Sequence, residues 1–457
     1  MSELEPIFKA YDVRGVVPEQ FDARIARAIG IGFARFATSD AGDGPKVTRV
    51  LVARDMRPSG VEMVAAFADG IRSTGLDVVD LGLASTDLLY FAAGSLDAPG
   101  AMFTASHNPA RYNGIKFCLS GARPVGQDSG LTVIRQVAES VLAGGGTGPD
   151  VTPGSITEQD LLGAFADHVR SFVDTSTLAP LKVVADTANG MGGLIVPAVF
   201  APLPFDLEVM YGELDGTFPN HPADPIQPEN QADLRARVLE VGADIGLAFD
   251  GDADRVFLVD EKGVGLSGST TTAIIAAGIL AHHPGETVIH NLICSKTVPE
   301  VVIENGGTPV RTRVGHSFIK EVMASTGAIF GGEHSAHYYF RDNFRADSGI
   351  IAALVVLEQL SVAGVSLSEL RAPFERYGDS GEINTKVSDT DVVIERVAAH
   401  YASAQQDRMD GLTVDSGDWW FNLRASNTEP LLRLNLEAAD AQACALRVAE
   451  VRAVMAD

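Results

Sequence analysis

The chain has 457 residues, more than one hydrophobic core usually organises, and at about 100–200 residues per domain this length predicts three or four domains. Its hydrophobic content of 46%, charged content of 21%, 46 glycines and 22 prolines are ordinary for a globular protein and exclude collagen-like, disordered and disulfide-scaffold classes. The net charge of −25 opposes binding to nucleic acid or to an anionic membrane, so we expect neither as a partner.

One strand–helix–strand pattern occurs three times along the chain. A β-branched run at 49–55 is followed by a helical pattern at 59–73 behind a serine cap, and by a second strand at 76–81. The same order returns at two later places, namely 181–186, 191–202 and 205–210, and then 286–293, 296–304 and 308–314. Three α/β domains follow from this repetition.

A further strand of small apolar residues comes later in each unit and runs into a polar cluster. These strands are predicted at 100–105, 243–249 and 327–332, and the clusters follow at 106–109, 250–255 and 333–337. Ligands of parallel sheets bind beyond the carboxyl ends of the strands. The three clusters therefore predict a shared cleft between the domains.

The C-terminal segment has a different pattern and predicts a smaller α+β domain. Two strands, 418–424 and 431–437, flank a polar loop at 425–430, and a helical pattern follows them. Breaks are expected in the Gly/Pro-rich stretch 144–154, after Arg255 and near 365–375. The expected domains are therefore 1–150, 151–256, 257–369 and 370–457.

The cysteines and the N-terminus indicate a cytoplasmic protein. Cys118, Cys294 and Cys444 form no Cys-x-x-Cys pair, which argues against a thiolate zinc site or a disulfide framework and fits a reducing compartment. The acidic N-terminus lacks the basic and apolar regions of a signal peptide, and no run of about 18 apolar residues occurs. We therefore expect a soluble protein that is not exported.

Three carboxylates alternate in the cluster at 250–255. Asp250, Asp252 and Asp254 can all point at one hard cation from a turning loop, so we predict a metal site with Mg²⁺ as the natural guest. A calcium-binding EF-hand is excluded, because Arg255 stands where that loop requires glycine and because strand-like sequences flank the loop where helices are required.

Ser106 follows the strand at 100–105 and is a candidate nucleophile or phosphate carrier. The Gly-x-Ser-x-Gly pattern of a nucleophile elbow is absent, so an ordinary polar loop residue stays open as the alternative. Lys116 is placed to neutralise a transferring phosphoryl group or to move a proton. A solvated surface charge is the alternative for this lysine.

The loop after the strand at 418–424 combines a guanidinium, two hydroxyls and an amide. Arg424, Ser426, Asn427 and Thr428 together suit a phosphate monoester, with the arginine supplying a bidentate fork. A hydrogen-bonded hairpin turn favours the same residues. The residue types leave these two interpretations equal.

The remaining candidates are also open to two interpretations. Glu333 and Ser335 suit the vicinal hydroxyls of a sugar, while His337 is either functional or a satisfied interior histidine. His316 follows another strand and is similarly ambiguous, and Arg14 near the N-terminus is either functional or part of a salt bridge. Taken singly, these residues define no function.

Four motifs taken together resemble the α-D-phosphohexomutase superfamily over the whole chain. They are Thr104-Ala-Ser-His-Asn-Pro109, Asp250-Gly-Asp-Ala-Asp-Arg255, Gly332-Glu-His-Ser-Ala-His337 and Arg424-Ala-Ser-Asn-Thr-Glu-Pro430. The opening Phe8-Lys-Ala-Tyr-Asp-Val-Arg-Gly15 is similar to the bacterial phosphomannomutase/phosphoglucomutase branch. His334 and Ala336 depart from the Met and Gly that are commoner in this branch.

The resemblance implies three similar α/β domains and a smaller C-terminal α+β domain around a central cleft, and a role for each motif. Ser106 would carry a phosphoryl group, and Mg²⁺ would be bound by an oxygen of phospho-Ser106 with Asp250, Asp252 and Asp254. The other implied catalytic residues are His107, Lys116, Arg255 and His316, of which Lys116 and His316 are the candidates for proton transfer. The implied substrate-binding residues are Tyr11, Arg14, Glu333, Ser335 and His337, with Arg424, Ser426, Asn427 and Thr428 holding the non-reacting phosphate.

The implied activity is the reversible interconversion of hexose 1-phosphate and hexose 6-phosphate. Phospho-Ser106 gives its phosphoryl group to the free hydroxyl of the substrate, and the resulting hexose 1,6-bisphosphate returns its other phosphate to Ser106. The same bisphosphate is the expected activator. We expect phosphosugars as partners, a monomer or weak homo-oligomer, and cations gathered at the site although the whole chain is acidic.

Three alternatives use the same residues. A phosphoglucosamine mutase shares the chemistry on an amino sugar. A metal-dependent phosphatase would pass the phosphoryl group of Ser106 to water, and a non-catalytic phosphosugar sensor would never carry phosphate on Ser106.

Overall fold

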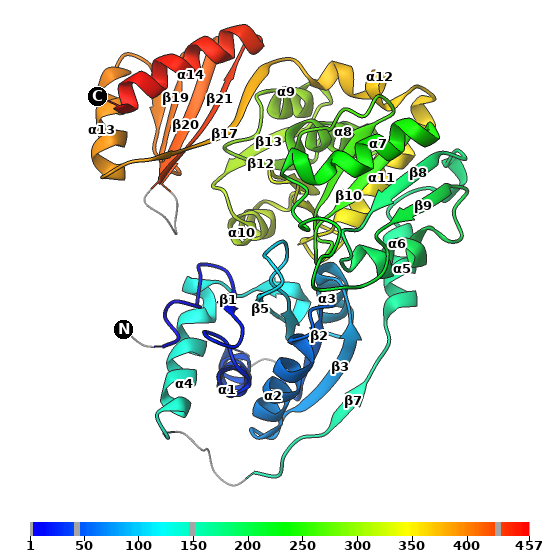
Figure 1. Cartoon of the computed structure of the whole chain (residues 1–457), viewed down its shortest axis with the longest axis vertical. Coiled ribbons are helices and arrows are strands. Elements are labelled where there is room, and N and C mark those ends of the chain that lie inside the picture. Colours follow the sequence, from blue (N-terminus) through cyan, green and yellow to red (C-terminus); the bar gives the residue numbers. More distant parts are fainter. Residues whose placement is uncertain (1–2, 41–45, 146–150, 426–430, 457) are drawn as a thin grey trace. The chain divides into compact units, whose positions relative to one another are not determined.

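The three expected strand–helix–strand units form, and each contributes to its own sheet (Figure 1). The structure is a computed structural model that describes residues 3–40, 46–145, 151–425 and 431–456. The chain divides into two compact units, Met1–Leu266 with His337–Leu367, and Ser267–Ala336 with Ser368–Asp457. The predicted class, three similar mixed α/β domains and a smaller C-terminal α+β domain, is confirmed, while the expected domain bounds stay predictions.

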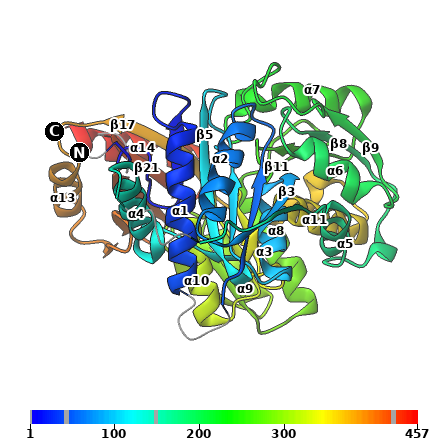
Figure 2. The ribbon, with the colours of Figure 1, turned by 90° about the horizontal axis from the view of Figure 1, so that it is seen from below.

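The first sheet has the order β1-β5-β4-β2-β3-β7, in which β4 pairs parallel with β2 and antiparallel with β5. Its strands are β1 (Val13–Val16), β2 (Arg49–Arg54), β3 (Asp77–Leu83), β4 (Gly100–Phe103), β5 (Tyr112–Leu119) and β7 (Ile156–Glu158), with β6 (Arg123–Pro124) beside β5. Helices that pack together against this sheet are α1 (Ala23–Asp40), α2 (Gly60–Arg72) and α4 (Thr132–Leu142), as Figure 2 shows. Helix α3 (Thr86–Ser95) contacts β2, β4 and β5.

Four phenylalanines fill the space between the helices and the first sheet. The ring centroid of Phe67 on α2 lies 5.1 Å from that of Phe103, edge to face, and 6.2 Å from that of Phe117. Phe33 on α1 lies 4.7 Å from Phe117. The two helices approach closely at Gly30, where a Cβ atom would lie 2.3 Å from the carbonyl oxygen of Phe67. This core fixes β4, from which the Ser106 loop leaves.

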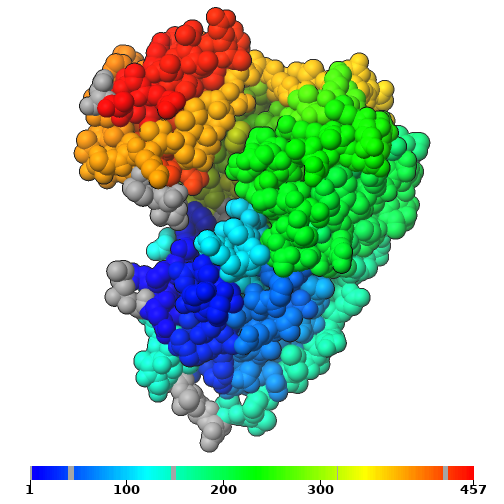
Figure 3. All heavy atoms as spheres, in the orientation of Figure 1, coloured from blue at the N-terminus to red at the C-terminus, as the bar shows by residue number. Residues whose placement is uncertain are grey.

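The second sheet repeats the arrangement with the order β11-β10-β8-β9, so β10 occupies the place that β4 has in the first sheet. Its strands are β8 (Lys182–Asp186), β9 (Asp206–Met210), β10 (Ile245–Phe249) and β11 (Val256–Asp260), and its helices are α5 (Leu162–Arg170), α6 (Gly192–Phe200) and α7 (Ala232–Val241). The same compact unit includes β15 (Tyr338–Phe340), β16 (Ala346–Asp347) and α11 (Gly349–Ala363), and α11 packs against β11 and α5. Figure 3 shows the part around the second sheet (green) against the first (blue), and a hydrogen bond between Thr86 and Asp252 joins them.

The second compact unit holds β12, β13 and β14 of the third sheet together with the fourth sheet. In the third sheet β12 (Thr287–Asn291) pairs parallel with β13 (Thr308–Thr312) and with β14 (Phe330–Gly332), so β14 takes the place of β4 and β10. Its helices are α8 (Gly268–His282), α9 (Thr297–Glu304) and α10 (His316–Thr326). The antiparallel fourth sheet has the order β17-β21-β20-β19-β18. Its elements are β17 (Gly378–Lys386), α13 (Thr390–His400), β18 (Gln405–Asp407), β19 (Leu412–Asp415), β20 (Trp419–Ala425), β21 (Leu431–Ala438) and α14 (Ala441–Ala456).

Among the described residues, no single helix is long and apolar enough to cross a membrane. One bent helix pair, Gly349–Ala363 with Leu367–Phe374, meets the requirement by length and composition only. Most of α11 is buried within the first compact unit, which accounts for its apolar composition.

Replacing Phe67 by alanine is expected to destabilise the first compact unit by roughly 3–5 kcal/mol, because the lost ring leaves a cavity that the helices close incompletely. Calorimetry should show the corresponding unfolding transition at a lower temperature. Val61 lies on the same helix with 58% of its surface exposed, so Val61→Ala is the control and should shift the transition little. Equal shifts in the two variants would contradict the central place of the aromatic cluster.

Candidate active site

Ser106 follows β4 and points its hydroxyl at the loop after β10. Its φ of +49° is a left-handed conformation that residues other than glycine rarely adopt. The Ser106 N–H donates a hydrogen bond to Thr104 Oγ1 at 2.8 Å, and the Ser106 hydroxyl donates to Asp250 Oδ2 at 2.8 Å. The side chain is buried, so these contacts set its orientation.

Arg57 holds the loop that carries Ser106. This arginine is buried between Asp55 and the loop, and its Nε lies 3.1 Å from Asp55 Oδ2. Its two terminal nitrogens donate hydrogen bonds of 2.7–3.0 Å to four backbone carbonyls, those of Ser106, Asn108 and Pro109 in the loop and that of Tyr112 at the start of β5. The guanidinium therefore satisfies carbonyls at both ends of the loop between β4 and β5, and it fixes the path of the loop.

The Asp55–Arg57 pair is expensive to bury. Burial raises the pKa of Asp55 although Arg57 opposes this, and burial lowers the pKa of Arg57 although Asp55 opposes it. Desolvation thus outweighs the attraction across the pair, which makes the pair a weak source of stability. We infer that its contribution is the fixed conformation of the Ser106 loop.

Asp250, Asp252 and Asp254 form a buried carboxylate cluster after β10. One oxygen from each lies within 4.8 Å of the others, and the turn passes through Ala253 with a φ of +61°. Among the described residues, Asp252 Oδ1 and Asp254 Oδ1 are buried carboxylate oxygens without a hydrogen-bond partner. Buried oxygens of this kind are costly unless a ligand meets them, and hard cations prefer oxygen ligands. The residues therefore fit a divalent cation such as Mg²⁺.

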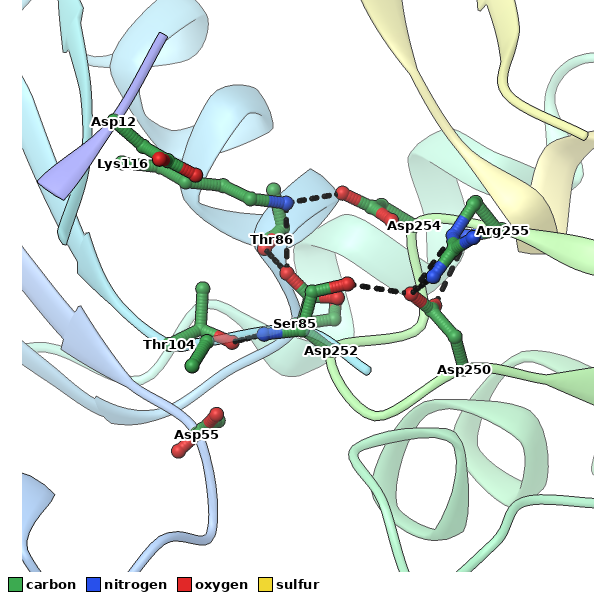
Figure 4. Close-up of polar contacts among 12 residues, drawn as sticks. Asp12, Asp55, Ser85, Thr86, Thr104, Lys116, Asp250, Asp252, Asp254 and Arg255 are labelled. Atoms are coloured by element: carbon green, nitrogen blue, oxygen red, sulfur yellow. Dashed lines mark hydrogen bonds and ion pairs between the residues drawn. The ribbon is translucent and has the colours of Figure 1, made fainter. Parts of the chain in front are cut away.

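Two cations contact the carboxylate cluster directly (Figure 4). Lys116 on β5 places Nζ 2.8 Å from Asp252 Oδ2 and 2.5 Å from Asp254 Oδ2. Arg255 donates from Nε to Asp250 Oδ2 at 3.0 Å. The Oδ2 atoms of the three aspartates are thus paired with cations, while Asp252 Oδ1 and Asp254 Oδ1 remain for a ligand.

The buried charges change the protonation of these groups. Burial, together with Asp254 and Asp252, raises the pKa of Asp250 to about 8, against the effect of Arg255. Burial also opposes the charged forms of Lys116 and Asp252, but the contact between the two side chains outweighs this effect. The contact keeps the pKa of Lys116 well above the ordinary value of a lysine, and it keeps the pKa of Asp252 well below the ordinary value of an aspartate. Burial and the two neighbouring carboxylates therefore disfavour the charged form of Asp250, and a divalent cation at the cluster would favour it.

Two other elements contact the Ser106 loop, since Arg255 is hydrogen-bonded to His107 and Arg14 is hydrogen-bonded to Asn108. Burial and then Arg255 lower the pKa of His107 well below its ordinary value, so its Nδ1 accepts a hydrogen bond from Arg255 Nη2 at 2.6 Å. Arg14 on β1 donates to Asp12 Oδ2 at 2.8 Å and to Asn108 Oδ1 at 2.5 Å. The half-buried Tyr11 precedes this pair.

His337 lies in the first compact unit, whereas its sequence neighbours Glu333 and Ser335 lie in the second. It forms an antiparallel bridge with Arg255, and its Nε2 is 4.0 Å from Asp254 Oδ1. The structure therefore places His337 beside the carboxylate cluster.

The second compact unit holds the predicted residues of the third and fourth sheets. Glu333 follows β14 and is buried, and its Oε1 accepts hydrogen bonds from Asn291 Nδ2 at 3.1 Å and from the Gly315 N–H at 3.2 Å. Ser335 is half-buried in the same loop. These contacts hold the Glu333 carboxylate at the carboxyl ends of β12 and β14.

Arg424 lies near the end of β20, and its Nη2 donates to Glu382 Oε2 at 2.9 Å. The predicted phosphate-binding residues Ser426, Asn427 and Thr428 lie outside the described residues. His316 begins α10, and its side chain is likewise outside the described part of the chain. The roles assigned to these residues stay predictions.

Sequence reasoning missed Asp55, Arg57 and Thr86. Asp55 and Arg57 could have been found from their position directly after β2. Because β2 runs parallel to β4, residues that follow these two strands lie at the same edge of the sheet. Thr86 follows β3 and a serine N-cap, which has the appearance of an ordinary helix start. The backbone hydrogen bonds that distinguish these residues leave no pattern in the sequence.

Four family models match the chain in order. They describe phosphoglucomutase/phosphomannomutase alpha/beta/alpha domains I, II and III at residues 5–142, 163–263 and 267–377, and the C-terminal domain at 382–454. Together they cover most of the sequence, including every motif quoted from it.

Known proteins resemble the chain over nearly its full length. Proteins named phosphohexose mutases from Xanthomonas campestris pv. campestris are 42% identical over 451 residues, 98% of each chain. A phosphomannomutase from Salmonella typhimurium is 40% identical over 443 residues, 94% of each chain. The crystal structure of a phosphoglucomutase/phosphomannomutase family protein from Burkholderia thailandensis has a TM-score of 0.88 at 31% identity, and the match covers 100% of this chain and 97% of that one.

Removing Arg57 alone should be far more harmful than removing the whole ion pair. Arg57→Met leaves Asp55 buried without its partner, which is expected to cost about 3–5 kcal/mol of stability. The double variant Asp55→Leu/Arg57→Met should recover the part of this loss that comes from the unpaired carboxylate, but neither the hydrogen bonds to the four carbonyls nor the ordered Ser106 loop. Thermal unfolding measures the first effect, and the protease sensitivity of the loop measures the second. Recovery of native protease resistance in the double variant would contradict the role of Arg57 in holding the loop.

Proposed function

The chain belongs to the phosphoglucomutase/phosphomannomutase family and is a mutase, and we propose that it interconverts the 1- and 6-phosphates of mannose and glucose through phospho-Ser106. The observation that carries this proposal is the buried Ser106 hydroxyl, 2.8 Å from Asp250 at the edge of the carboxylate cluster. The choice of sugar rests on the names of the relatives, phosphomannomutase among them.

The cation site of the proposal consists of Asp250, Asp252, Asp254 and an oxygen of phospho-Ser106. Two oxygens support it, since Asp252 Oδ1 and Asp254 Oδ1 are buried without a hydrogen-bond partner among the described residues. A bound Mg²⁺ supplies neutralisation of charge on the transferring phosphoryl group.

The chain's own side chains position the reacting groups and move the proton. The bond between phosphorus and Ser106 Oγ breaks as a bond to the sugar hydroxyl oxygen forms, and the hydroxyl proton passes to a base. His316 is the proposed base, while Lys116, charged by its contacts with Asp252 and Asp254, offsets phosphoryl charge and can supply a proton. In the second half of the cycle the other phosphate of the bisphosphate returns to Ser106.

The remaining residues are proposed to bind the substrate. Glu333 and Ser335 would read vicinal hydroxyls, which suits a carboxylate held by Asn291 and Gly315. The non-reacting phosphate would be held by the fourth-sheet residues Arg424, Ser426, Asn427 and Thr428, with Tyr11, Arg14 and His337 as further contacts. His107 and Arg255 would orient Ser106, in line with their contacts to it and to Asp250. We propose hexose 1,6-bisphosphate as the activator because it can supply the phosphoryl group of Ser106.

Incubation with hexose 1,6-bisphosphate should add one phosphoryl group to the protein at Ser106. Intact-mass measurement and peptide mapping should find this group in the native chain and not in Ser106→Ala, which should lose mutase activity by several orders of magnitude. Ser176→Ala changes an exposed serine of the same compact unit and should behave like the native protein. Full activity of Ser106→Ala would reject the phosphoserine mechanism.

A panel of mannose, glucose and glucosamine 1-phosphates, primed with a trace of hexose bisphosphate, should show the highest kcat/KM on the two neutral sugars. Product analysis should find the 6-phosphate and little free phosphate. A clear preference for the amino sugar would favour a phosphoglucosamine mutase, and dominant release of phosphate would favour a phosphatase.

A further inference from the structure

The first turn of α3, a helix that contacts the first sheet, forms hydrogen bonds to the carboxylate cluster. Thr86 is the first residue of this helix and is completely buried. Its backbone N–H donates to the backbone oxygen of Asp252 at 3.1 Å, and its hydroxyl donates to Asp252 Oδ2 at 2.6 Å. One residue therefore fixes both the main chain and the side chain of Asp252.

These contacts decide which oxygen of Asp252 is offered to a ligand. Oδ2 receives two donors, the Thr86 hydroxyl at 2.6 Å and Lys116 Nζ at 2.8 Å. Oδ1 is buried and has no hydrogen-bond partner among the described residues. With Oδ2 occupied on one side, the carboxylate can turn only Oδ1 toward the shared position of Asp250 and Asp254.

The first turn of α3 is itself held rigidly. Its N-cap Ser85 accepts a hydrogen bond from the Leu88 N–H at 3.3 Å and donates to Asp87. The buried Asp87 carboxylate also accepts a hydrogen bond of 2.6 Å from Ser348, the N-cap of α11. The N-cap residues of two helices thus bind the same carboxylate, and this holds the first turn of α3, including Thr86, in a fixed position.

We propose that Thr86 is a positioning residue that sets the cation affinity of the Asp250–Asp254 loop. It acts through Asp252 without touching the cation, and the proposal rests on the cation site of the proposed function. Partners of this kind commonly change metal affinity by roughly 10–100-fold when they are removed, because they orient the ligand and tune its basicity.

The test compares Thr86→Val, which keeps the shape and loses the hydroxyl, with Thr86→Ser, which keeps the hydroxyl. Mn²⁺ binding to the full chain, without sugar, is measured by titration calorimetry and by the electron paramagnetic resonance signal of free Mn²⁺. Thr86→Val should bind Mn²⁺ roughly 10–100-fold more weakly, and Thr86→Ser within about twofold of the native chain. Mutase activity of Thr86→Val should recover at correspondingly higher Mg²⁺, which a general loss of structure would not produce.

Thr271→Val is the matched control. Thr271 is a buried threonine in the first turn of α8, and its hydroxyl has no hydrogen-bond partner among the described residues. This variant should bind Mn²⁺ like the native chain. If Thr86→Val does not fold, Thr86→Ala removes the same donor with less bulk and carries the same expectation.

Native Mn²⁺ affinity in the folded variant lacking the hydroxyl would overturn the proposal, as would equal weakening in Thr86→Ser or in Thr271→Val. A native chain that binds Mn²⁺ but does not isomerise phosphosugars would reject the proposed function and leave the role of Thr86 intact. Failure of the two ideas is therefore separable.

Discussion

The hydrogen bond between the Ser106 hydroxyl and the Asp250 carboxylate is the contact on which the site of the first compact unit depends. It joins two loops that leave equivalent strands of two similar sheets. Burial and the neighbouring carboxylates raise the pKa of Asp250 to about 8, so the charged form of this carboxylate is disfavoured beside the serine. A cation at the cluster would favour the charged form, and the proposed phosphoryl group on Ser106 would then lie beside that cation.

The repeated sheet explains how the opposing charges arrive at one place. The strand β4 delivers Ser106 and β10 delivers the aspartates, each at its carboxyl end. The antiparallel neighbours of these strands supply the cations, since Lys116 lies on β5 opposite Met102, and Arg255 directly precedes β11. One topology therefore places a serine or a carboxylate cluster after the end of a strand, and a balancing cation on or directly before the antiparallel neighbour of that strand. Strand β14 repeats the first half of this pattern with Glu333.

Much of this site could be predicted from the sequence because its residues follow recognisable strands in unbroken motifs. The predictions stop where function depends on buried contacts to backbone atoms. Arg57 binds four backbone carbonyls, and Thr86, the first residue of a helix, binds Asp252. Neither contact produces a periodic pattern or a characteristic spacing in the sequence. Nor does the sequence show that the chain passes from one compact unit to the other between Ala336 and His337, which separates His337 from the loop motif that contains it.

The whole chain has a net charge of −25, yet cations lie at the site in the first compact unit. The cations named next each pair with an aspartate. Arg14 pairs with Asp12, Arg57 with Asp55, Arg255 with Asp250, and Lys116 with Asp252 and Asp254. Pairing allows these side chains to be buried in defined positions, which unpaired cations in a low-dielectric site would not tolerate. When all of these groups are ionised, the four cations meet five aspartates, and a bound divalent cation would reverse this balance. Under the proposed function, the binding of a phosphate at this site would depend on the cation, and Thr86, by presenting Asp252 Oδ1, would contribute to that dependence.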